Sequence, residues 1–335
     1  LMDTGMTFCL GESYLQEIQE DDLFVVSQAW QLYPSNRPLV EGLKKGQLKI
    51  VTPMELYLSI GRSRELVTVG VTGSNGKSTT VNMVASILEA ANRPFVLAGN
   101  YRYRGPILSR LAQLSAGDVL LLEVSNRHLE ALSETVDVAI VTNVTENHIE
   151  EYRDFSEYID VKRRMITGQL QDGSHAILNL DDPISSTFQS FARGRAALFS
   201  LERNDADAFI ESGVLFVRQG DETVEVCSAA SLSVLGEHNV ANALAATLAC
   251  LPLGVEVPAV SAGLTDFKGV PGRLEHVRSV GDVSFYYDIE STTPEATIRA
   301  LQSFPGTPVQ LILGGEDKAL NYDALARQIK SMEVT

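Results

Sequence analysis

The sequence predicts an α/β protein whose central part is a doubly wound parallel sheet with a phosphate-binding loop. Three observations lead to this prediction. Apolar, β-branched runs alternate with helix-like segments from Leu66 onward, which is typical of parallel sheets with helices on both faces. One such run, at 67–72, passes into glycines and closes on Lys77-Ser78-Thr79 before a helical segment. The length of 335 residues is enough for two or three domains.

The charge balance argues against a protein that binds nucleic acid or a membrane surface. The chain has 27 basic and 43 acidic residues, so any phosphate ligand needs a local site. Cys9, Cys227 and Cys250 are too scattered for a disulfide framework or a Cys-based zinc site. Neither a signal peptide nor an apolar run of about 18 residues is found. We expect a cytoplasmic protein without nucleic-acid partners or membrane insertion. Because the sequence starts at Leu1 and stops at Thr335, we expect a fragment lacking both ends.

The first half of the chain divides into a small α/β unit and a longer, regular one. In the small unit, apolar runs at 23–27 and 47–51 predict strands, with a helix near 38–45 between them. From residue 66 the alternation becomes regular. The predicted strands are then 66–72, 95–98, 118–124, 136–144 and 174–180, and the predicted helices are 78–91, 106–115, 127–133 and 155–170.

The second half contains a hairpin, an Ala-rich helix and a second αβ pattern. The hairpin is predicted at 209–217 with its turn at Ser212-Gly213, and the helix runs from Gly236 to about Cys250. After a Gly- and Pro-containing loop, strands are predicted at 283–288 and 308–314, and helices at 294–304 and 322–331. We therefore predict three domains: a partial N-terminal one at 1–65, a central one at 66–269 and a partial C-terminal one at 270–335.

The central motif is Thr72-Gly73-Ser74-Asn75-Gly76-Lys77-Ser78-Thr79, between a predicted strand and a predicted helix. Glycines let backbone amides turn toward phosphate oxygens, and the helix N-terminus adds positive potential. Lys77 can reach the terminal phosphates, and the Ser78 hydroxyl can ligate Mg²⁺. Val71 stands where the strict phosphate-loop pattern has its first glycine, so the motif has the shorter T-G-x-N-G-K-S form.

Three further polar residues follow or accompany predicted strand ends. Glu123 closes a buried apolar run and is suited to holding Mg²⁺, although a capping carboxylate is the alternative. His148 comes just after another strand, where a polar residue without a ligand role is the alternative. Lys162 lies in a helical segment whose basic residues otherwise indicate a solvated face.

These motifs and their order resemble the Mur ligases, and most closely the MurD family within them. The resemblance covers nearly the whole chain. It rests on the phosphate loop, Gly99-Asn100, Glu123-Val124-Ser125, Asn143–His148, Lys162, Asn179–Asp182, Gly236–Asn239 with Asn242, Gly269–Arg273, Asp288 and Pro294–Thr297.

The resemblance implies an ATP-dependent ligase of peptidoglycan precursor synthesis. The γ-phosphoryl group of ATP would first pass to the carboxylate of UDP-N-acetylmuramoyl-L-alanine. The amine of D-glutamate would then attack the acyl phosphate. Two Mg²⁺ ions are implied, one held by Ser78 and Glu123 and the other by His148. Lys162 matches a carbamylated lysine of the family, which supports the second ion.

The resemblance also implies residues for the other ligand groups. The nucleotide would contact the loop residues Gly73 to Thr79, Asn239 and Asn242 near adenine, and Arg273 and Asp288 near phosphates and ribose. The UDP-sugar would lie near Ser27 and Asn100, and D-glutamate near Thr292 and Lys318. A monomer is expected.

Departures from the family pattern leave two alternatives open. Glu290 stands where the family has a lysine beside the incoming dicarboxylate, and Ser27-Gln28-Ala29 replaces a Ser-Pro-Gly turn. The first alternative is a Mur-type or folylpolyglutamate-synthetase-like amide ligase for another amino acid. The second is a nucleotide-binding paralogue without ligase activity, because the altered residues border the substrate side while the ATP side is intact.

Overall fold

The structure of the chain is a computed structural model that describes residues 23–26, 30, 33–45, 49–100, 106–132, 134–146, 151–169, 172–315, 320–332 and 334. Three predicted site residues, Ser27, His148 and Lys318, lie outside these ranges. In the described part of the chain, no helix combines the length and the apolar character needed to cross a bilayer.

A large sheet forms the centre of the molecule. Its strands, in chain order, are β3 (Val67–Thr72), β4 (Phe95–Gly99), β5 (Val119–Glu123), β6 (Val138–Val141), β7 (His175–Asn179), β8 (Arg195–Ser200), β9 (Ala208–Glu211), β10 (Val214–Gln219) and β11 (Glu222–Ser228). Within the described ranges they form one nine-stranded sheet, in the order β11-β10-β9-β8-β7-β6-β3-β5-β4. Neighbours from β4 to β9 are parallel, and β9, β10 and β11 continue as an antiparallel meander. The predicted doubly wound parallel sheet is confirmed.

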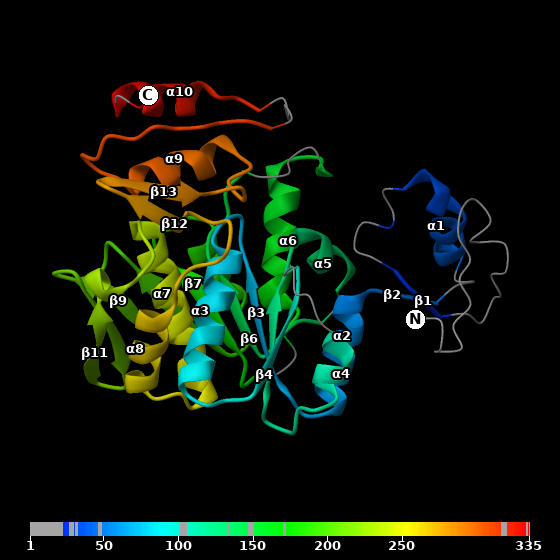
Figure 1. Cartoon of the computed structure of the whole chain (residues 1–335). Coiled ribbons are helices and arrows are strands. Elements are labelled where there is room, and N and C mark those ends of the chain that lie inside the picture. Colours follow the sequence, from blue (N-terminus) through cyan, green and yellow to red (C-terminus); the bar gives the residue numbers. More distant parts are fainter. Residues whose placement is uncertain are drawn as a thin grey trace.

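Helices cover both faces of this sheet (Figure 1). One face carries α3 (Lys77–Ala90), α7 (Glu237–Cys250) and α8 (Val257–Asp266), and the other carries α2 (Pro53–Ser63), α4 (Ile107–Leu111), α5 (Asn126–Ala131) and α6 (Phe155–Thr167). On β5, Val119 and Leu121 belong to the first core, and Leu120 and Leu122 to the second. An apolar run without alternation is what a strand covered on both faces requires. Short 3-10 segments lie at Pro34–Asn36, Ser185–Phe191, Ala229–Ser231 and Leu251–Leu253.

The position of β3 in the sheet determines where the loops meet. β3 pairs in parallel with β5 on one side and with β6 on the other. Because β4 lies beyond β5, the chain leaves β3 in one direction and later crosses to its opposite side. Open α/β sheets bind ligands at such a reversal, beyond the carboxyl ends of the strands. The loops after β3, β5 and β6 therefore define the candidate site.

The N-terminal part is a small unit with its own core. β1 (Leu23–Val25) and β2 (Lys49–Val51) pair in parallel, with α1 (Arg37–Lys44) between them in the chain. Val26, Trp30 and Leu39 are buried together there. The two strands and the helix were predicted. The following helix, α2, was not, although Thr52 and Glu55 form a capping box before Pro53–Ser63.

The C-terminal part is built differently from its prediction. β12 (Glu275–Val280) and β13 (Val283–Tyr287) form an antiparallel hairpin, and the two predicted helices are present as α9 (Pro294–Gln302) and α10 (Asp323–Ser331). The prediction of a strand at 308–314 was wrong, because these residues join no sheet in the described structure. An apolar run forms a strand only beside another strand, and here Ile312 is 96% exposed.

Candidate functional site

The phosphate loop lies between β3 and α3, as predicted, and two of its glycines adopt left-handed backbone angles. Gly73 has φ +147° and Gly76 has φ +84°. A Cβ atom at Gly73 would lie 2.0 Å from Thr142 Oγ1, so only glycine fits this close approach. Gly76 is the N-cap of α3 and provides no side chain to cap the helix. The first-turn amides of α3 are therefore free of a side-chain cap and suited to an anion.

The loop that follows β6 holds the phosphate loop in place. Asn143 accepts a hydrogen bond from the Asn75 amide through Oδ1 at 3.0 Å and donates from Nδ2 to the Asn75 carbonyl at 3.1 Å. Thr142 Oγ1 donates to the same carbonyl at 2.6 Å. Ser74 Oγ donates to the Thr145 carbonyl at 2.8 Å, and the Thr145 amide donates back to it. The loop is thus fixed by side chains without any ligand.

Lys77 stands at the first position of α3 and folds back over its own loop. Its Nζ donates to the carbonyls of Gly73 at 2.8 Å and Ser74 at 3.1 Å. Burial lowers the pKa of Lys77 from its ordinary value, Glu123 raises it, and Arg273 lowers it further. The cation therefore already lies at the loop, where it can neutralise phosphate charge.

Lys162 of α6 lies against the other side of the same loop, which the sequence alone could not show. Its side chain is 1% exposed, and its Nζ donates to Thr72 Oγ1 at 3.3 Å and to the Gly73 carbonyl at 3.2 Å. Both acceptors are neutral oxygens. Nζ also lies 5.3 Å from the centroid of the Tyr158 ring. Burial lowers the pKa of Lys162 well below its ordinary value, and Lys77 lowers it further, because both disfavour the charged ammonium.

Glu123 ends β5 and is buried, with 2% of its surface exposed. Oε1 accepts a hydrogen bond from Asn100 Nδ2 at 3.2 Å. Oε2 is buried and has no hydrogen-bond partner among the described residues. An unpaired buried carboxylate oxygen is costly, so this atom fits a cation ligand.

The protein oxygens at Glu123 and Ser78 suit an Mg²⁺ ion that takes most of its ligands from phosphate and water. Over the described ranges, no group of three or more His, Cys, Asp or Glu side chains is placed to hold a metal ion. Mg²⁺ commonly takes one or two carboxylates and completes its shell with phosphate oxygens and water. One carboxylate, Glu123, and one hydroxyl, Ser78, are therefore a sufficient protein contribution.

Arg273 connects the C-terminal part to the start of α3. Its Nη2 donates to Ser78 Oγ at 3.2 Å and lies 3.7 Å from Glu290 Oε2. Asp288, predicted near ribose, accepts from the Leu274 amide at 3.0 Å and from the Ser291 hydroxyl. Thr292 is exposed. The structure therefore brings Arg273 to the loop and uses the Asp288 carboxylate to hold the backbone beside Arg273.

Asn239 and Asn242 of α7 lie behind the loop. Asn242 Oδ1 accepts from Thr80 Oγ1 at 3.2 Å, and Asn242 Nδ2 donates to Asn239 Oδ1 at 3.1 Å. Asn239 Nδ2 donates to the Leu235 carbonyl at 2.6 Å. Both asparagines are buried. Their hydrogen bonds join α7 to the first turns of α3.

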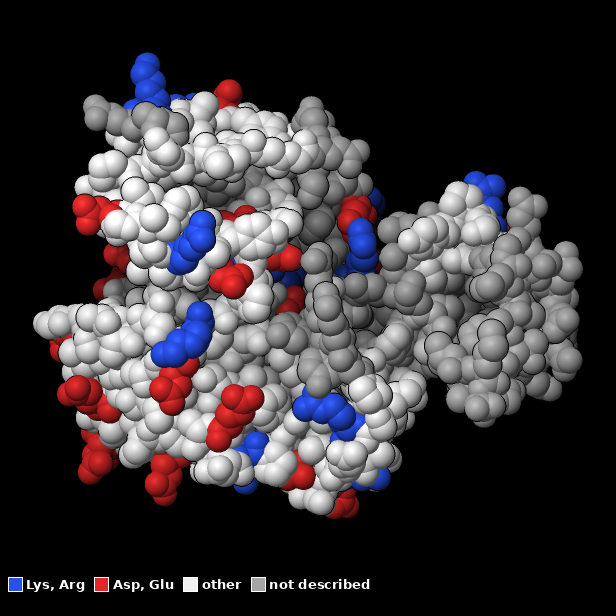
Figure 2. Space-filling view, viewed as in Figure 1, with Lys and Arg blue, Asp and Glu red and all other residues white. Residues whose placement is uncertain are grey.

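Three basic side chains gather at this site in an otherwise acidic protein. Lys77 lowers the pKa of Lys162, and Arg273 lowers that of Lys77, so Lys77 is within interaction range of both other residues. On the face shown in Figure 2, basic and acidic side chains are interspersed. With a net charge of −16, the protein can attract phosphate only through such a local cluster.

Three residues that shape the loop from behind, Thr142, Thr145 and Tyr158, had no predicted role, although Ser74 Oγ and Tyr158 OH lie 3.1 Å apart. A signal for the first two existed, since polar residues at the end of an apolar strand in a parallel sheet lie at the ligand edge. No local pattern marks Tyr158. Ser27, His148 and Lys318 lie outside the described residues.

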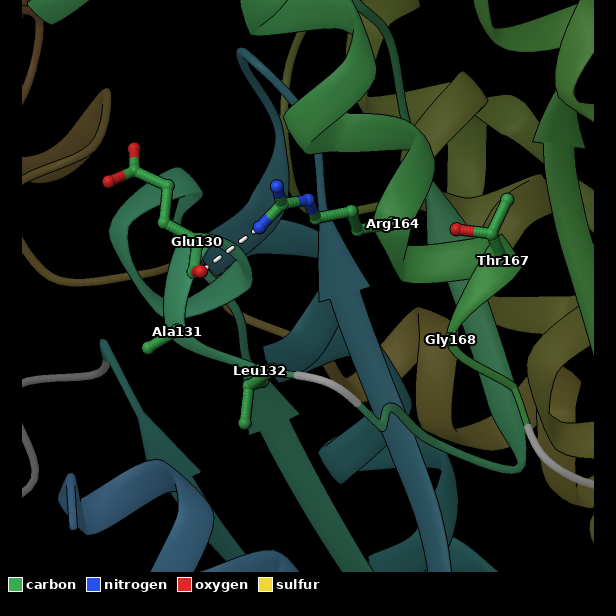
Figure 3. Close-up of a pocket in the computed structure, with 6 residues that line it drawn as sticks. All are labelled: Glu130, Ala131, Leu132, Arg164, Thr167 and Gly168. Carbon is green, nitrogen blue, oxygen red and sulfur yellow. Dashed lines mark hydrogen bonds between the residues drawn. The ribbon is translucent and has the colours of Figure 1, made fainter. Parts of the chain in front are cut away.

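A shallow hollow between α5 and α6 lies apart from these residues. It is lined by Glu130, Ala131, Leu132, Arg164, Thr167 and Gly168 (Figure 3). Arg164 Nη1 donates to the Glu130 carbonyl at 3.0 Å, so its guanidinium satisfies the carbonyl end of α5. No residue of the phosphate loop lines this hollow.

Comparison with known sequences identifies similar proteins. The family description "Mur ligase middle domain" matches residues 71–250. A UDP-N-acetylmuramoylalanine–D-glutamate ligase of Symbiobacterium thermophilum is 31% identical over 325 residues, which cover 96% of this chain and 69% of that protein. The ligase of the same name from Solibacter usitatus is 33% identical over 294 residues, covering 87% and 64%. The chain thus spans about two thirds of the length of these relatives.

Comparison with solved structures gives the same fold. A UDP-N-acetylmuramoyl-L-alanyl-D-glutamate–2,6-diaminopimelate ligase matches with a TM-score of 0.65 and 18% identity, covering 95% of this chain and 76% of that one. The MurF ligase of Thermotoga maritima, solved in complex with ADP, matches with a TM-score of 0.65 and 20% identity, covering 95% and 82%. At these identities the likeness concerns the fold.

Proposed function

Because the chain belongs to the Mur ligase family, as a member of its MurD branch, we propose that it joins D-glutamate to UDP-N-acetylmuramoyl-L-alanine at the expense of ATP. The observation that supports this most directly is the preformed loop of Gly73 to Thr79, which lies beside the buried carboxylate of Glu123. The reaction activates a carboxylate by phosphorylation, and phosphoryl transfer depends on positioning and charge neutralisation more than on covalent chemistry by the protein. The cations at this loop supply that neutralisation.

On the nucleotide side, each role follows from a contact. The first-turn amides of α3 and the ammonium of Lys77 bind the β- and γ-phosphates. Arg273, which donates to Ser78 Oγ, is proposed to bind the phosphates, and Asp288, whose carboxylate accepts from the Leu274 amide, is proposed for the ribose. Ser78 and the free Oε2 of Glu123 hold Mg²⁺. The metal supplies charge neutralisation on the phosphate oxygens.

Lys162 is the residue we propose to be carbamylated. A carbamate forms when a neutral amine attacks CO₂, with loss of one proton from the nitrogen. Burial and Lys77 lower the pKa of Lys162, which makes the neutral amine easier to form than in a free lysine. The product is an anion near the Lys77 ammonium, and together with His148 it would support the second Mg²⁺.

The remaining proposals concern the substrates and the setting. Ser27 and Asn100 are proposed for the UDP-sugar, and Thr292 and Lys318 for the amino acid. We propose a monomer that works in the cytoplasm, where ATP and UDP-linked precursors are present.

A second candidate function is ligation of a different amino acid. Glu290, which lies 3.7 Å from Arg273, favours it, because the Glu290 carboxylate would repel the carboxylates of an incoming dicarboxylic amino acid nearby. A cationic or neutral amino acid would meet no such repulsion.

The test is phosphate release by the full-length gene product with ATP, Mg²⁺ and UDP-N-acetylmuramoyl-L-alanine, across a panel of acidic, neutral and basic amino acids. Release that requires D-glutamate supports the first proposal. The second proposal is supported if the unaltered protein releases phosphate with another amino acid and the Glu290→Lys variant instead requires D-glutamate. ATP binding without release for any acceptor contradicts both.

A further inference from the structure

We propose that Glu290 is a positioning residue for Arg273, because its carboxylate draws the guanidinium away from the Ser78 hydroxyl and so frees this hydroxyl for Mg²⁺ when the nucleotide binds. The inference rests on the proposed nucleotide site and deepens it, since it gives Glu290 a role on the nucleotide side. It is carried by the two oxygen atoms that lie beside one nitrogen of Arg273.

This nitrogen of Arg273 lies between oxygen atoms from distant parts of the chain. Nη2 donates to Ser78 Oγ, at the start of α3, at 3.2 Å. The same Nη2 lies 3.7 Å from Oε2 of Glu290, which follows β13. The first distance is that of a hydrogen bond and the second is slightly longer than one. Arg273 is therefore bonded to the hydroxyl, with a carboxylate beside it as a second acceptor.

The Ser78 hydroxyl is also the proposed ligand of Mg²⁺, and the two uses conflict. Mg²⁺ binds oxygen atoms at about 2.1 Å, so an ion on Ser78 Oγ would lie within about 5 Å of Arg273 Nη2. Two cations at this distance repel each other, most strongly where water is excluded. Binding of the metal therefore favours departure of the guanidinium from Ser78.

The Glu290 carboxylate offers the guanidinium a better acceptor than the one it leaves. A hydrogen bond between two charged groups is roughly twice as strong as one to a neutral oxygen. Arg273 also lowers the pKa of Lys77, so its positive charge acts on the lysine of the phosphate loop. When Arg273 turns toward Glu290, the carboxylate offsets part of this charge and Ser78 Oγ becomes free.

The backbone beside Arg273 is fixed, so the movement falls to the side chain. The Leu274 amide donates to Asp288 Oδ1 at 3.0 Å. The Glu290 amide donates to the Gly272 carbonyl at 3.1 Å, which holds Glu290 next to the arginine. The side chains of Arg273 and Glu290 are 38% and 27% exposed, which leaves both of them room to turn.

The first test uses the ligand-free, full-length protein. The side-chain Nε–H resonance of Arg273 is assigned in NMR spectra by its loss in Arg273→Met. We expect Glu290→Gln and Ser78→Ala each to shift this resonance, because each variant removes an acceptor beside the guanidinium. Asp282→Asn is the matched control, since it removes one charge from the exposed turn between β12 and β13. A resonance that moves no more in Glu290→Gln than in this control overturns the proposal.

The second test measures how much Mg²⁺ strengthens the binding of ATP. The dissociation constant of ATP is measured by calorimetry with EDTA and with Mg²⁺, and the ratio of the two values is the Mg²⁺ enhancement. We expect Glu290→Gln to lower this enhancement about fivefold, because Arg273 then stays on Ser78 Oγ. Glu290→Asp keeps the charge but shortens the side chain by one methylene group, so it should lower the enhancement nearly as much.

The Arg273→Met background separates positioning from a direct effect of the Glu290 charge. In this background Glu290→Gln should leave the enhancement unchanged, because no guanidinium remains to be repositioned. An equal loss with and without Arg273 would show that the carboxylate acts directly on the metal, and would overturn the inference. So would an unchanged enhancement with an altered KM for the amino acid, which would place the action of Glu290 on the acceptor.

Failure of the proposed function gives a different result. If the unaltered protein binds ATP neither with nor without Mg²⁺, the nucleotide site fails, and the link of Glu290 to the metal fails with it. The NMR resonance still shows in that case whether Glu290 holds Arg273. Thermal midpoints of the variants, compared with that of Asp282→Asn, show whether a loss of binding reflects a loss of folding.

Discussion

The central sheet and the C-terminal part after residue 272 contain apolar runs of similar sequence pattern, but the two runs lie in opposite environments. β5 is an apolar run, and so is 309–313, yet Leu121 is fully buried while Ile312 is 96% exposed. The first run has neighbours on both sides and helices on both faces. The second has no strand beside it in the described structure.

The difference shows what a local pattern can determine. An apolar run is more stable when it is buried, but the sequence of the run does not say which elements will bury it. Neighbouring elements provide both the covering side chains and the hydrogen-bond partners of its backbone. At the central edge these neighbours also fix the polar loops, so the site has one shape. At β12 and β13 every residue is exposed. Substitutions of the same type in the two regions should therefore differ in a defined way.

The largest difference is expected between two lysines. In bicarbonate-free buffer, Lys162→Met should raise the free energy of unfolding, because an amine that is costly to protonate in the core is replaced by an apolar side chain. In complete assays it should lower ligation by about 10³-fold, because the group proposed to support the second Mg²⁺ is lost. Lys330→Met, at an exposed position of α10, should change neither.

The lowered pKa of Lys162 determines whether the stability of the folded chain rises or falls with pH. Its pKa is lowered from 10.5 by burial and by Lys77, so the unfolded chain keeps a proton that the folded chain loses. Stability of the unaltered chain therefore rises with pH from the folded pKa up to the ordinary lysine value. Urea unfolding at several pH values should show a smaller rise in Lys162→Met. An equal rise would contradict a buried, neutral Lys162.

The second contrast uses two isoleucines. Ile140 on β6 is fully buried, so Ile140→Ala should cost about 2–5 kcal/mol of unfolding free energy. Ile312→Ala should stay within about 0.5 kcal/mol, as surface substitutions do. Urea unfolding of both variants measures the difference. A comparable loss for Ile312→Ala would mean that 309–313 is buried in solution.

A pair of glycines tests the close approach at the loop. Gly76 and Gly281 both have left-handed angles, with φ +84° and +57°, but a Cβ atom meets Asn242 at Gly76 and nothing within 4 Å at Gly281. Both alanine variants carry backbone strain of about 1 kcal/mol, and Gly76→Ala should lose about 2 kcal/mol more through the clash. Thermal unfolding compares them. Equal losses would show that the loop accommodates the methyl group by moving.

The smallest effect concerns two histidines. His128 Nδ1 accepts from the Ser125 amide at 3.2 Å in the capping box of α5, and burial lowers its pKa to about 4. The unfolded chain binds this proton first, so stability is lost as pH falls from 6.5 toward 4, by at most about 2 kcal/mol at pH 5. His128→Gln keeps an acceptor and should reduce this loss. His276→Gln, on exposed β12, should leave the profile unchanged in the same unfolding series.

The central fold was largely predictable because the strands from β3 to β7 are apolar runs that each carry their own signal. The hairpin turn at Ser212-Gly213 and the Ala-rich helix were also found where predicted. β8, β11, β12, α8 and α2 were missed. β8 begins with Arg195, β11 begins with the polar pair Glu222-Thr223, and α8 begins at Val257-Pro258 after a glycine-containing turn, so none carries a clear signal of its type.

The part of the site that lies in one continuous motif was predictable from the sequence. The parts that the fold brings together from distant segments were not. The loop from Gly73 to Thr79 is visible in the sequence because its geometry needs particular residue types. The contact of Lys162 with Thr72 joins residues 90 positions apart, and that of Arg273 with Ser78 joins residues 195 apart. No pattern within a helix indicates which loop it will lie against.

The order of strands has a consequence for how the chain reaches its working shape during synthesis. Val69 on β3 pairs with Leu121 and Val138. The ribosome therefore makes the partner strands of β3 only after β3 itself has been made. Contacts so distant along the chain form slowly, because a long loop must close before they stabilise anything. The residues that support the phosphate loop, Asn143 and then Asn242, emerge later still. A nascent chain that already contains the whole motif would therefore not yet hold the loop in its final shape, and competence to bind phosphate should appear only after α7 has been made.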